Sequence, residues 1–375
     1  MNTPWVEVFS IEKSQAYGEE FAEEYPWHAV FACQVVVRPF ESRERLKWGF
    51  NTAALYEEAT DRHRLFLESQ YAYDTLLRRE QPQRRTLAMR CINVPGKGLQ
   101  VGLIAKICAK SPSDARQAAA IYWREIHSLF PYDHELYPAT RQEDYHRLAG
   151  TDLLMHGSRP NTVAQIKRYE MPLNNTSVQI PVLGIWQAGP HADEPIWRAL
   201  AALPFAAMLN ISLRPTLLYD SERKHLLQLK QKLDRLESEQ MGPIANLIHK
   251  GWVTPFITRR LMPWGKFYYL QVHVVTEDQP VDDSLVRAIG ASLTRPSGDK
   301  LSPGFETERP ADEANARAWK SALHQMEILR TASDYSIPRL HEIADLEEAA
   351  AVFRFPYPPQ NGLPGVTLLN PAKDE

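Results

Sequence analysis

Apolar and polar positions along the chain form short runs that predict strands. Residues 31–37 and 101–108 are rich in β-branched and apolar side chains, and each run is long enough for one strand. Between residues 267 and 275 apolar and polar side chains alternate, with Gln271 and His273 on the polar side of the pattern. This alternation predicts a strand with one buried face and one exposed face.

The segments that follow these strands have the pattern of helices. Ser111 and Pro112 predict an N-cap followed by a first-turn proline, and Asp282 and Asp283 predict the start of another helix. The helix after Ser111 has one continuous apolar face, which consists of Ala115, Ala118, Ala119, Tyr122, Ile126 and Leu129. Short strands covered by amphipathic helices indicate an α+β fold.

Two parts of the chain share this order of elements. Residues 26–39 and 195–215 each contain a Pro/Trp start, an apolar run and an Arg-Pro pair, at Arg38–Pro39 and Arg214–Pro215. A charged helical segment and a strand carrying Leu-Gln-Val then follow in both parts. This self-similarity predicts two duplicated sheet-plus-helix units.

The predicted organisation has three parts. The first α+β repeat spans residues 1–150 and the second spans residues 151–300. Residues 301–375 are predicted to form a loop, a C-terminal helix and a Pro-rich extended linker that connects to another domain. Pro, Gly and charged residues dominate positions 295–310, which predicts an exposed loop or flap there.

Composition and charge place the chain among soluble globular proteins. Forty-three Lys and Arg residues nearly balance 46 Asp and Glu residues, so a strongly basic nucleic-acid coat and an acidic tail are both excluded. The three cysteines are too few for a disulfide framework. No signal peptide and no apolar run long enough to cross a membrane is recognised. We therefore expect a cytoplasmic protein without membrane contact.

The glycine-lysine cluster at residues 94–98 is the one candidate for a nucleotide site. A phosphate-binding P-loop needs the spacing G-x-x-x-x-G-K-[ST] between a strand and a helix, with its second glycine directly before the lysine and Ser or Thr directly after it. Here Gly98 follows Lys97 and strand-like residues lie on both sides. The segment therefore predicts a hairpin turn, and we expect no cofactor.

An acidic and histidine-rich segment from Asp133 to His146 is the candidate for an unrecognised hydrolase or nuclease site. Glu143 and His146 have the three-residue spacing that a helix can use to hold a metal. No complementary ligand pair is found elsewhere, and a solvated connecting loop explains the same residues. The sequence contains no recognisable catalytic motif, so no metal or catalytic residue is assigned.

Aromatic and basic residues alternate between positions 252 and 269. Stacking rings with nearby cations suit single-stranded nucleic acid or the acidic face of a partner protein. Alternatively, the rings belong to the core and the cations are solvated. The candidate interaction residues are Trp252, Phe256, Arg259, Arg260, Trp264, Lys266 and Tyr268.

The C-terminal segment carries a resemblance to a known family. Asp345 and Glu348 have capping-box spacing, and the following FRFPYPPQNGLPGV places Phe353 and Phe355 as candidate anchors on a domain or partner. This helix and linker resemble the segment before the ATPase core of HerA-type and conjugation-type, type IV secretion-related DNA translocases. The apolar strand with Arg-Pro is similar to their amino-terminal region. The chain departs from the family in lacking a P-loop, a Walker B strand and an arginine finger.

The resemblance implies a non-catalytic assembly or docking module of a hexameric DNA-translocating ATPase, in conjugation or anti-phage defence. The implied partner is a P-loop ATPase domain in the same or a separate chain, within a homo- or hetero-oligomer. Two alternatives stay open. One is a nucleic-acid-binding module that uses residues 252–269, and the other is an enzyme with a site around residues 133–146.

Overall fold

The structure of the chain is a computed structural model. The described residues are 2–11, 25–37, 52–72, 85–157, 159–175, 178–188, 193–238, 253–263, 265–295, 304–329, 339–356 and 365–370. Helices cover a large antiparallel sheet, which confirms the predicted α+β class.

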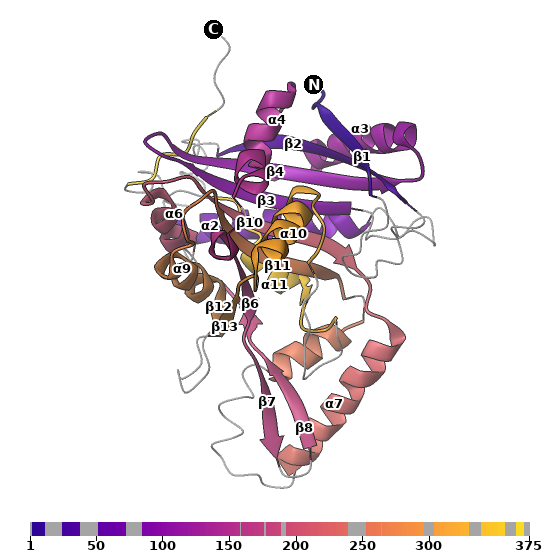
Figure 1. Cartoon of the computed structure of the whole chain (residues 1–375). Coiled ribbons are helices and arrows are strands. Elements are labelled where there is room, and N and C mark those ends of the chain that lie inside the picture. Colours follow the sequence, from indigo (N-terminus) through magenta and orange to yellow (C-terminus); the bar gives the residue numbers. More distant parts are fainter. Residues whose placement is uncertain are drawn as a thin grey trace.

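One sheet runs through the molecule, and its described strand pairs are all antiparallel (Figure 1). Its spatial order is β1 (Val6–Ser10), β2 (Trp27–Val37), β4 (Gly98–Ala109), β3 (Arg85–Val94), β10 (Ala207–Thr216), β11 (Phe267–Thr276), β6 (Val163–Arg168) and β13 (Phe305–Glu308). Two short strands join this path, β5 (His134–Pro138) on β2 and β14 (Ile343–Asp345) on β11. Alternate side chains of each strand face opposite sides of the sheet, so the sheet has two faces to bury.

The first face of the sheet is apolar and carries the largest core cluster. Alternate strand residues such as Phe31, Leu103, Leu209 and Val272 belong to this cluster. The helices packed on them are α2 (Thr52–Ala72), α3 (Pro112–Leu129), α6 (Asp193–Ala201), α9 (Asp283–Leu293) and α11 (Leu346–Val352). Burial of apolar surface is the main contribution that holds these helices on the sheet.

The second face is covered by α4 (Gln142–Ala149), α5 (Thr151–Met155) and α10 (Glu313–His324), over smaller apolar clusters. A row of buried polar side chains crosses the strands beneath them in register. The row consists of Gln34, Arg90, Asn210, His273 and Gln165, with Gly102 between the first two. The half-exposed strand predicted around residue 273 is therefore wrong, because a second helical layer covers its polar side.

Arg90 connects this row to the helices above it. Its Nε donates to Asn210 Oδ1 at 3.0 Å, and its two terminal nitrogens donate to the carbonyl oxygens of Ala149 and Leu323. Ala149 is the last residue of α4, and Leu323 lies in the last turn of α10. Helix carboxyl ends carry unpaired carbonyls and partial negative charge, so one buried cation serves both helices. Burial lowers the pKa of Arg90 to about 10.

A second, smaller core lies at one end of the sheet. The ribbon of β7 (Glu170–Asn175) and β8 (Val178–Leu183) extends away from the sheet beside α7 (Asp220–Ser238) (Figure 1). Leu226 and Leu229 of α7 pack with a helix at residues 253–261 in this core. The short strands β9 (Ile185–Trp186) and β12 (Thr294–Arg295) pair with each other in a separate two-stranded sheet.

Most of the local predictions are confirmed, although Leu129, predicted on the apolar face of α3, is 49% exposed. Residues 31–37, 101–108 and 267–275 lie inside β2, β4 and β11. Ser111 and Asp282 are N-caps whose side chains accept backbone N–H groups of α3 and α9. Residues 94–98 form the hairpin turn between β3 and β4, as the glycine spacing predicts. Residues 305–308, predicted as part of a flap, instead form strand β13 on β6.

The predicted repeats share one continuous sheet. Strand β3, from the first repeat, pairs with β10, from the second, between Ala207 and Leu213. Helices α2 and α3 pack in the same core, whereas α7 and α9 pack in different ones, so the two parts differ in helix arrangement. Arg214 and Pro215 lie inside β10, and Arg38–Pro39 lies outside the described residues.

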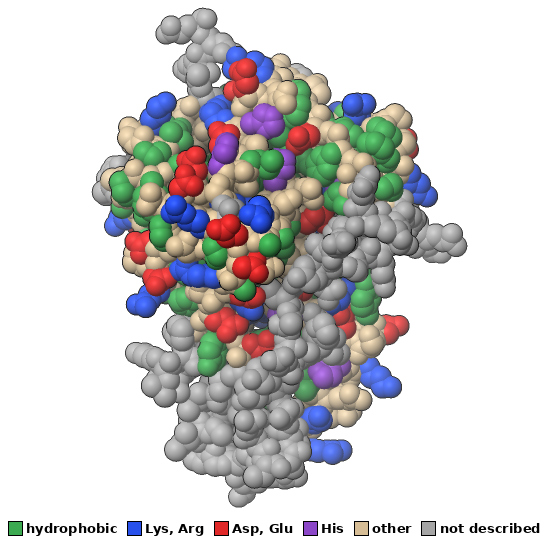
Figure 2. Space-filling view, viewed as in Figure 1, with side chains coloured by type: hydrophobic (Ala, Val, Ile, Leu, Met, Phe, Trp, Pro, Cys, Tyr) green, Lys and Arg blue, Asp and Glu red, His purple; other side chains and the backbone are tan. Residues whose placement is uncertain are grey.

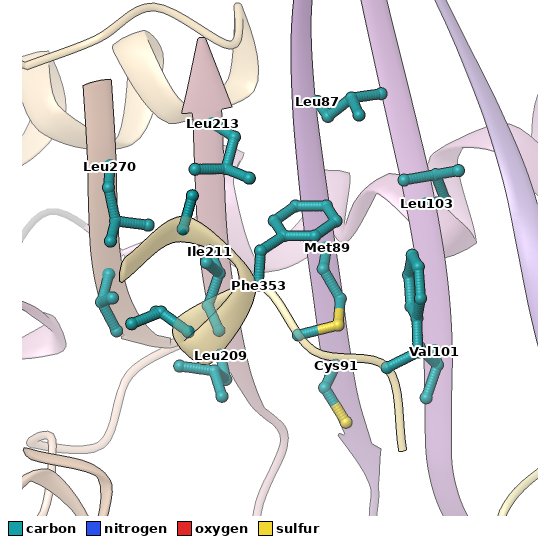
Figure 3. Close-up of a cluster of buried hydrophobic side chains, with 14 of the residues drawn as sticks. Leu87, Met89, Cys91, Val101, Leu103, Leu209, Ile211, Leu213, Leu270 and Phe353 are labelled. Atoms are coloured by element: carbon teal, nitrogen blue, oxygen red, sulfur yellow. The ribbon is translucent and has the colours of Figure 1, made fainter. Parts of the chain in front are cut away.

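The predicted third part, residues 301–375, is not a separate loop, helix and connector where the structure describes it, because residues 304–329 and 339–356 are integral to the fold. Phe353 and Phe355 are buried in the main core, and Phe353 lies over β3 and β10 beside Met89 (Figure 3). These two rings therefore anchor their own chain. The Pro-rich residues 357–364 lie outside the described part of the chain.

Residues 365–370 return to the sheet at the start of β4. The backbone N–H of Leu99 donates to Thr367 O at 2.7 Å, and that of Leu369 donates to Leu99 O at 2.8 Å. Gly98 makes this approach possible, since a Cβ there would lie 2.3 Å from Thr367 O. The end of the described chain thus adds a bridge to a central strand.

Candidate functional site at the seam beside β11

The rings predicted to stack on nucleic acid are part of the core. Phe256 is 4% exposed and Tyr268 is 1% exposed, and the Tyr268 hydroxyl donates to Leu67 O at 2.8 Å. Trp252 and Trp264 lie outside the described residues. The described rings have no face available for stacking, so this structure corrects their assignment as contact residues.

The three cations of the same stretch lie in different surroundings. Arg260 is fully buried with its guanidinium 3.8 Å from the centre of the Phe256 ring. Lys266 Nζ lies 2.5 Å from Glu68 Oε1 on α2. Arg259 is the most exposed of the three, and its nearest described carboxylate oxygen belongs to Asp345, at 3.8 Å. The structure therefore does not gather these cations into one surface patch.

The acidic and histidine-rich segment is divided between different contacts. Asp133 accepts two hydrogen bonds from Arg62 of α2, at 2.7 and 2.5 Å. His146, on α4, contacts the side chains of Gln142 and Thr151 instead. No group of three His, Cys, Asp or Glu residues within the described ranges could hold a metal ion.

Other reactive side chains are buried among apolar groups. Burial raises the pKa values of the Cys33 and Cys91 thiols, so thiolate formation is disfavoured. Burial also lowers the pKa of His134 to about 4 and that of His63 to about 3. These histidines contact Phe355, so they are neutral members of an aromatic cluster near neutral pH.

A seam in the sheet brings together the charged residues that the sequence leaves far apart. On the edge of β11 away from β10, β6 pairs with Val272–Val275 and β14 pairs with Phe267–Tyr269. Arg168, the last residue of β6, lies at this seam and donates to the carbonyl oxygens of His341 and Ile343 at 2.8 and 2.6 Å. Its guanidinium therefore bridges the two strands where their own ladders stop.

Glu348 of α11 neutralises two arginines at the seam. Its carboxylate lies 3.0 Å from Arg168 Nη1 and 2.8 Å from Arg260 Nη2, and all three side chains are buried. Burial alone would raise the pKa of Glu348, but the charges of Arg260 and Arg168 outweigh it and bring the pKa below its ordinary value. The carboxylate is thus ionised, as two buried guanidinium groups require.

The same carboxylate completes the predicted capping box. Asp345 Oδ1 accepts from the Glu348 N–H at 2.9 Å, and Glu348 Oε2 accepts from the Asp345 N–H at 3.1 Å. The capping prediction is confirmed, and its acidic residue has a further use, because it also binds the arginines. Helix α11 is therefore fixed at its first turn by the two capping-box hydrogen bonds and the two arginine contacts, and at its end by Phe353.

A small pocket, open to solvent and with enclosed room for about one water molecule, lies beside this cluster. Its lining is Gln165, Ile166, Lys167, Arg168, Glu170, Trp186, Leu270, Gln271, Glu306, His341 and Glu342. These residues come from both sides of the seam, so the pocket is a consequence of β11 changing its neighbour from β6 to β14. It combines carboxylates with Lys167 and Arg168 and is the candidate binding site.

Sequence reasoning missed these pocket residues. Glu306 falls in the stretch interpreted as a flap, where alternation of Phe305, Glu306, Thr307 and Glu308 is the one local sign of a strand. Arg168 and Glu348 are 180 residues apart, and nothing in their local sequence indicates that they meet. Only the three-dimensional pairing of the strands brings them together.

Comparison with known proteins found no match. No protein-family model matches the chain, and no curated protein matches it. Within the described ranges no helix has both the length and the apolar character needed to cross a bilayer. The function proposed below therefore rests on the contacts of this chain.

Proposed function

We propose that the chain is a non-catalytic assembly or docking module for a P-loop DNA-translocating ATPase, carried on the same or a separate chain. The observation that supports this most is the rigid attachment of α11 directly before the Pro-rich stretch. Glu348 binds Arg168 and Arg260 in the interior, while Phe353 and Phe355 are buried in the main core. A docking element must hold its position relative to the body of the module, and these contacts provide that.

Several side chains that could take part in catalysis are bound to other residues of the chain, which also favours docking over catalysis. Arg62 binds Asp133, and the carboxylate of Glu348 is committed to two arginines. The two thiols described as buried have raised pKa values. Each of these groups has a structural use, which lowers the case for an active site built from them.

The exposed side of α11 is the part of this helix that a partner can reach. Glu347 lies on that side, with its side chain 60% exposed, and its carboxylate lies 3.4 Å from Arg64 of α2. Glu313, in the first turn of α10, is similarly exposed and has a comparable contact to Arg317 at 3.7 Å. The two glutamates therefore form a matched pair of positions for a test of docking.

The test is coexpression with the P-loop ATPase encoded beside or in continuation of this chain, followed by light scattering of the purified complex. We expect the chain to enter a ring-sized assembly with the ATPase. Glu347→Arg should weaken this association about tenfold or more, as a reversed charge in an interface does. Glu313→Arg should leave it unchanged.

Two results would contradict the proposal. One is an ATPase that forms the same assembly with and without this chain. The other is hydrolysis of ATP or nucleic acid by the purified chain alone, abolished by substitution of a residue within it. Binding of DNA by the isolated chain with a steep salt dependence would instead support the nucleic-acid alternative.

A further inference from the structure

Residues 365–370, here called the strap, lie on an edge of β4 that β2 does not reach. Strand β2 pairs with β4 from Ala109 as far as Gly102, while residues 98–101 of β4 continue beside β3. The strap pairs with this edge at Leu99 and runs parallel to β4 there (yellow in Figure 1). The edge of β4 at residues 98–101, here called the slot, is therefore a place where the sheet accepts one added strand.

The slot binds the strap through backbone groups. The Leu99 N–H donates to Thr367 O at 2.7 Å, and the Leu99 carbonyl accepts from the Leu369 N–H at 2.8 Å. The side-chain amide of the buried Gln34 donates to Leu369 O at 2.6 Å. Gly98 permits this close approach, because a Cβ there would lie 2.3 Å from Thr367 O. These contacts would bind the same segment of any copy of the chain.

Two apolar side chains of the strap add specificity. Val366 and Leu368 pack against the main core, whereas Thr367 between them is exposed. This alternation is that of a strand with one buried face. In strand addition, main-chain hydrogen bonds give affinity and the packing of alternate side chains gives specificity. The slot thus accepts an extended segment with apolar residues at two alternate positions.

The strap is attached to its own sheet by a small contact. Among the described residues its backbone forms one isolated bridge, whereas β3 pairs with β4 along its whole length. The sequence between Phe355 and Gly365 contains four prolines. Proline-rich segments act as semi-rigid spacers, which do not concentrate the strap at its own slot as a compact turn would. An identical strap from another copy can therefore compete for the slot.

We propose that copies of this chain exchange their straps, so that the strap of one copy occupies the slot on β4 of another. The neighbour's strap makes the same hydrogen bonds at Leu99 and Gln34 and buries the same two apolar side chains. Exchange of an identical element is a low-cost route to oligomers. This contact between copies goes beyond the proposed docking of an ATPase and does not depend on it.

Two full-length variants test the exchange by complementation. Gly98→Ala blocks the slot and keeps the strap, whereas Leu368→Asp spoils the strap and keeps the slot. Each variant alone should be monomeric in sedimentation velocity, because none of its copies has both an open slot and an intact strap. Mixed in equal amounts, the two should form a one-to-one dimer with a dissociation constant about tenfold or more below that of either variant alone, since Leu368 is buried only in the mixture.

Two matched variants control for general damage. Gly96 lies in the same hairpin turn, also at positive φ, but a Cβ on it would have no neighbour within 4 Å. Thr367→Asp places a carboxylate on the exposed side of the strap. Gly96→Ala and Thr367→Asp should each associate as the wild type does, with a dimer fraction that rises with concentration. Gly98→Ala should lose this association, with circular dichroism as the check that it is folded.

Hydrogen exchange on the wild type covers the case in which a variant does not fold. A synthetic peptide of residues 364–371 should displace the strap, so that the Leu369 amide exchanges about tenfold faster while the Leu99 amide stays protected by the peptide. The same peptide with Leu368→Asp should have no effect. A Leu369 amide that keeps its protection at high peptide concentration would mean that the slot is closed to other copies.

Three further results would overturn the exchange. One is a mixture that stays as monomeric as its two components, and another is a wild type whose association is unchanged by Gly98→Ala. The third is a wild type that stays monomeric at every concentration while the peptide displaces its strap, because the slot would then serve a different polypeptide. These measurements use no ATPase, so they fail separately from the docking proposal, which is tested at Glu347.

Discussion

The two faces of the sheet attach their helices by different forces. On the first face α3 and α9 are attached by apolar side chains packed on residues such as Leu209 and Val272, and α11 adds to such packing the buried contacts of Glu348 with Arg168 and Arg260. On the second face buried cations reach backbone carbonyls, as Arg90 does at the ends of α4 and α10. Lys320 of α10 likewise donates to His156 O and Thr276 O.

This difference separates stability from specificity. Apolar burial is non-directional and grows with area, so the first face contributes most of the folding free energy. Hydrogen bonds of a buried cation are directional and contribute less net energy, but leaving one unmade is expensive. The second face therefore fixes where its helices lie, and its polar row ends at Gln165 in the seam pocket. Figure 2 shows side chains of both charge signs intermixed on the face of the molecule that it draws.

The largest effect is expected from truncation after Pro310. This removes α10, β14 and α11, together with the core residues Phe353 and Phe355. Loss of a large part of both helical layers should abolish cooperative unfolding and cause aggregation. Thermal unfolding followed by circular dichroism, with gel filtration, measures this. A monomeric truncated protein with a cooperative transition would show that these residues are a separable connector after all.

The next effect is expected at the seam. Glu348→Gln leaves Arg168 and Arg260 buried without a carboxylate, and should lower the free energy of unfolding by about 3 kcal/mol. The adjacent Glu347→Gln, which is exposed, should change it by less than about 0.5 kcal/mol. Urea unfolding measures both variants. Equal effects at the two positions would contradict the described cluster.

A smaller effect concerns acid. The pKa of His63 is about 3 in the folded protein, because of burial first, and about 6.5 in the unfolded chain. The unfolded chain thus binds the proton first, so stability is complete above pH 6.5 and falls as the pH decreases toward the folded value. His63→Phe should reduce the stability lost between pH 6.5 and 5 by about 1.5 kcal/mol. An unchanged pH profile of unfolding would mean that His63 is solvated.

The smallest effect is expected on the surface of α10. Arg317→Ala removes a contact to Glu313 in which both side chains are more than half exposed. Exposed pairs of this kind contribute little, so the free energy of unfolding should change by less than about 0.5 kcal/mol. This variant is the baseline for substitutions on the second face. A loss of about 2 kcal/mol would reveal a structural role that the contacts do not include.

The sequence predicts what is decided locally. The caps at Ser111, Asp282 and Asp345 depend on side chains a few residues from the groups they bind, and the turn at residues 94–98 depends on its own glycines. The α+β class follows from the same patterns. Each of these features is therefore readable without knowledge of the rest of the chain.

The rest of the fold and the candidate site depend on contacts between residues that are distant in sequence. His273 has the pattern of an exposed strand position, but α10, which begins 40 residues later, covers it. The rings of the aromatic-basic stretch are compatible with stacking or with a core, and the position of α2 decides for Tyr268. The seam pocket depends on five strands and a loop at once, so no local pattern could predict it.

Hydrogen exchange in Arg90→Met tests the difference between the two faces most directly. Methionine keeps much of the buried volume but donates no hydrogen bond to Ala149 O, Leu323 O or Asn210 Oδ1. We expect amides of α4 and α10 to lose protection together, while those of α3 and α9 keep theirs until global unfolding. Leu209→Ala, on the first face, should lower protection in all four helices by the same free energy. Uniform loss in both variants, or none in α4 and α10 of Arg90→Met, would contradict the account.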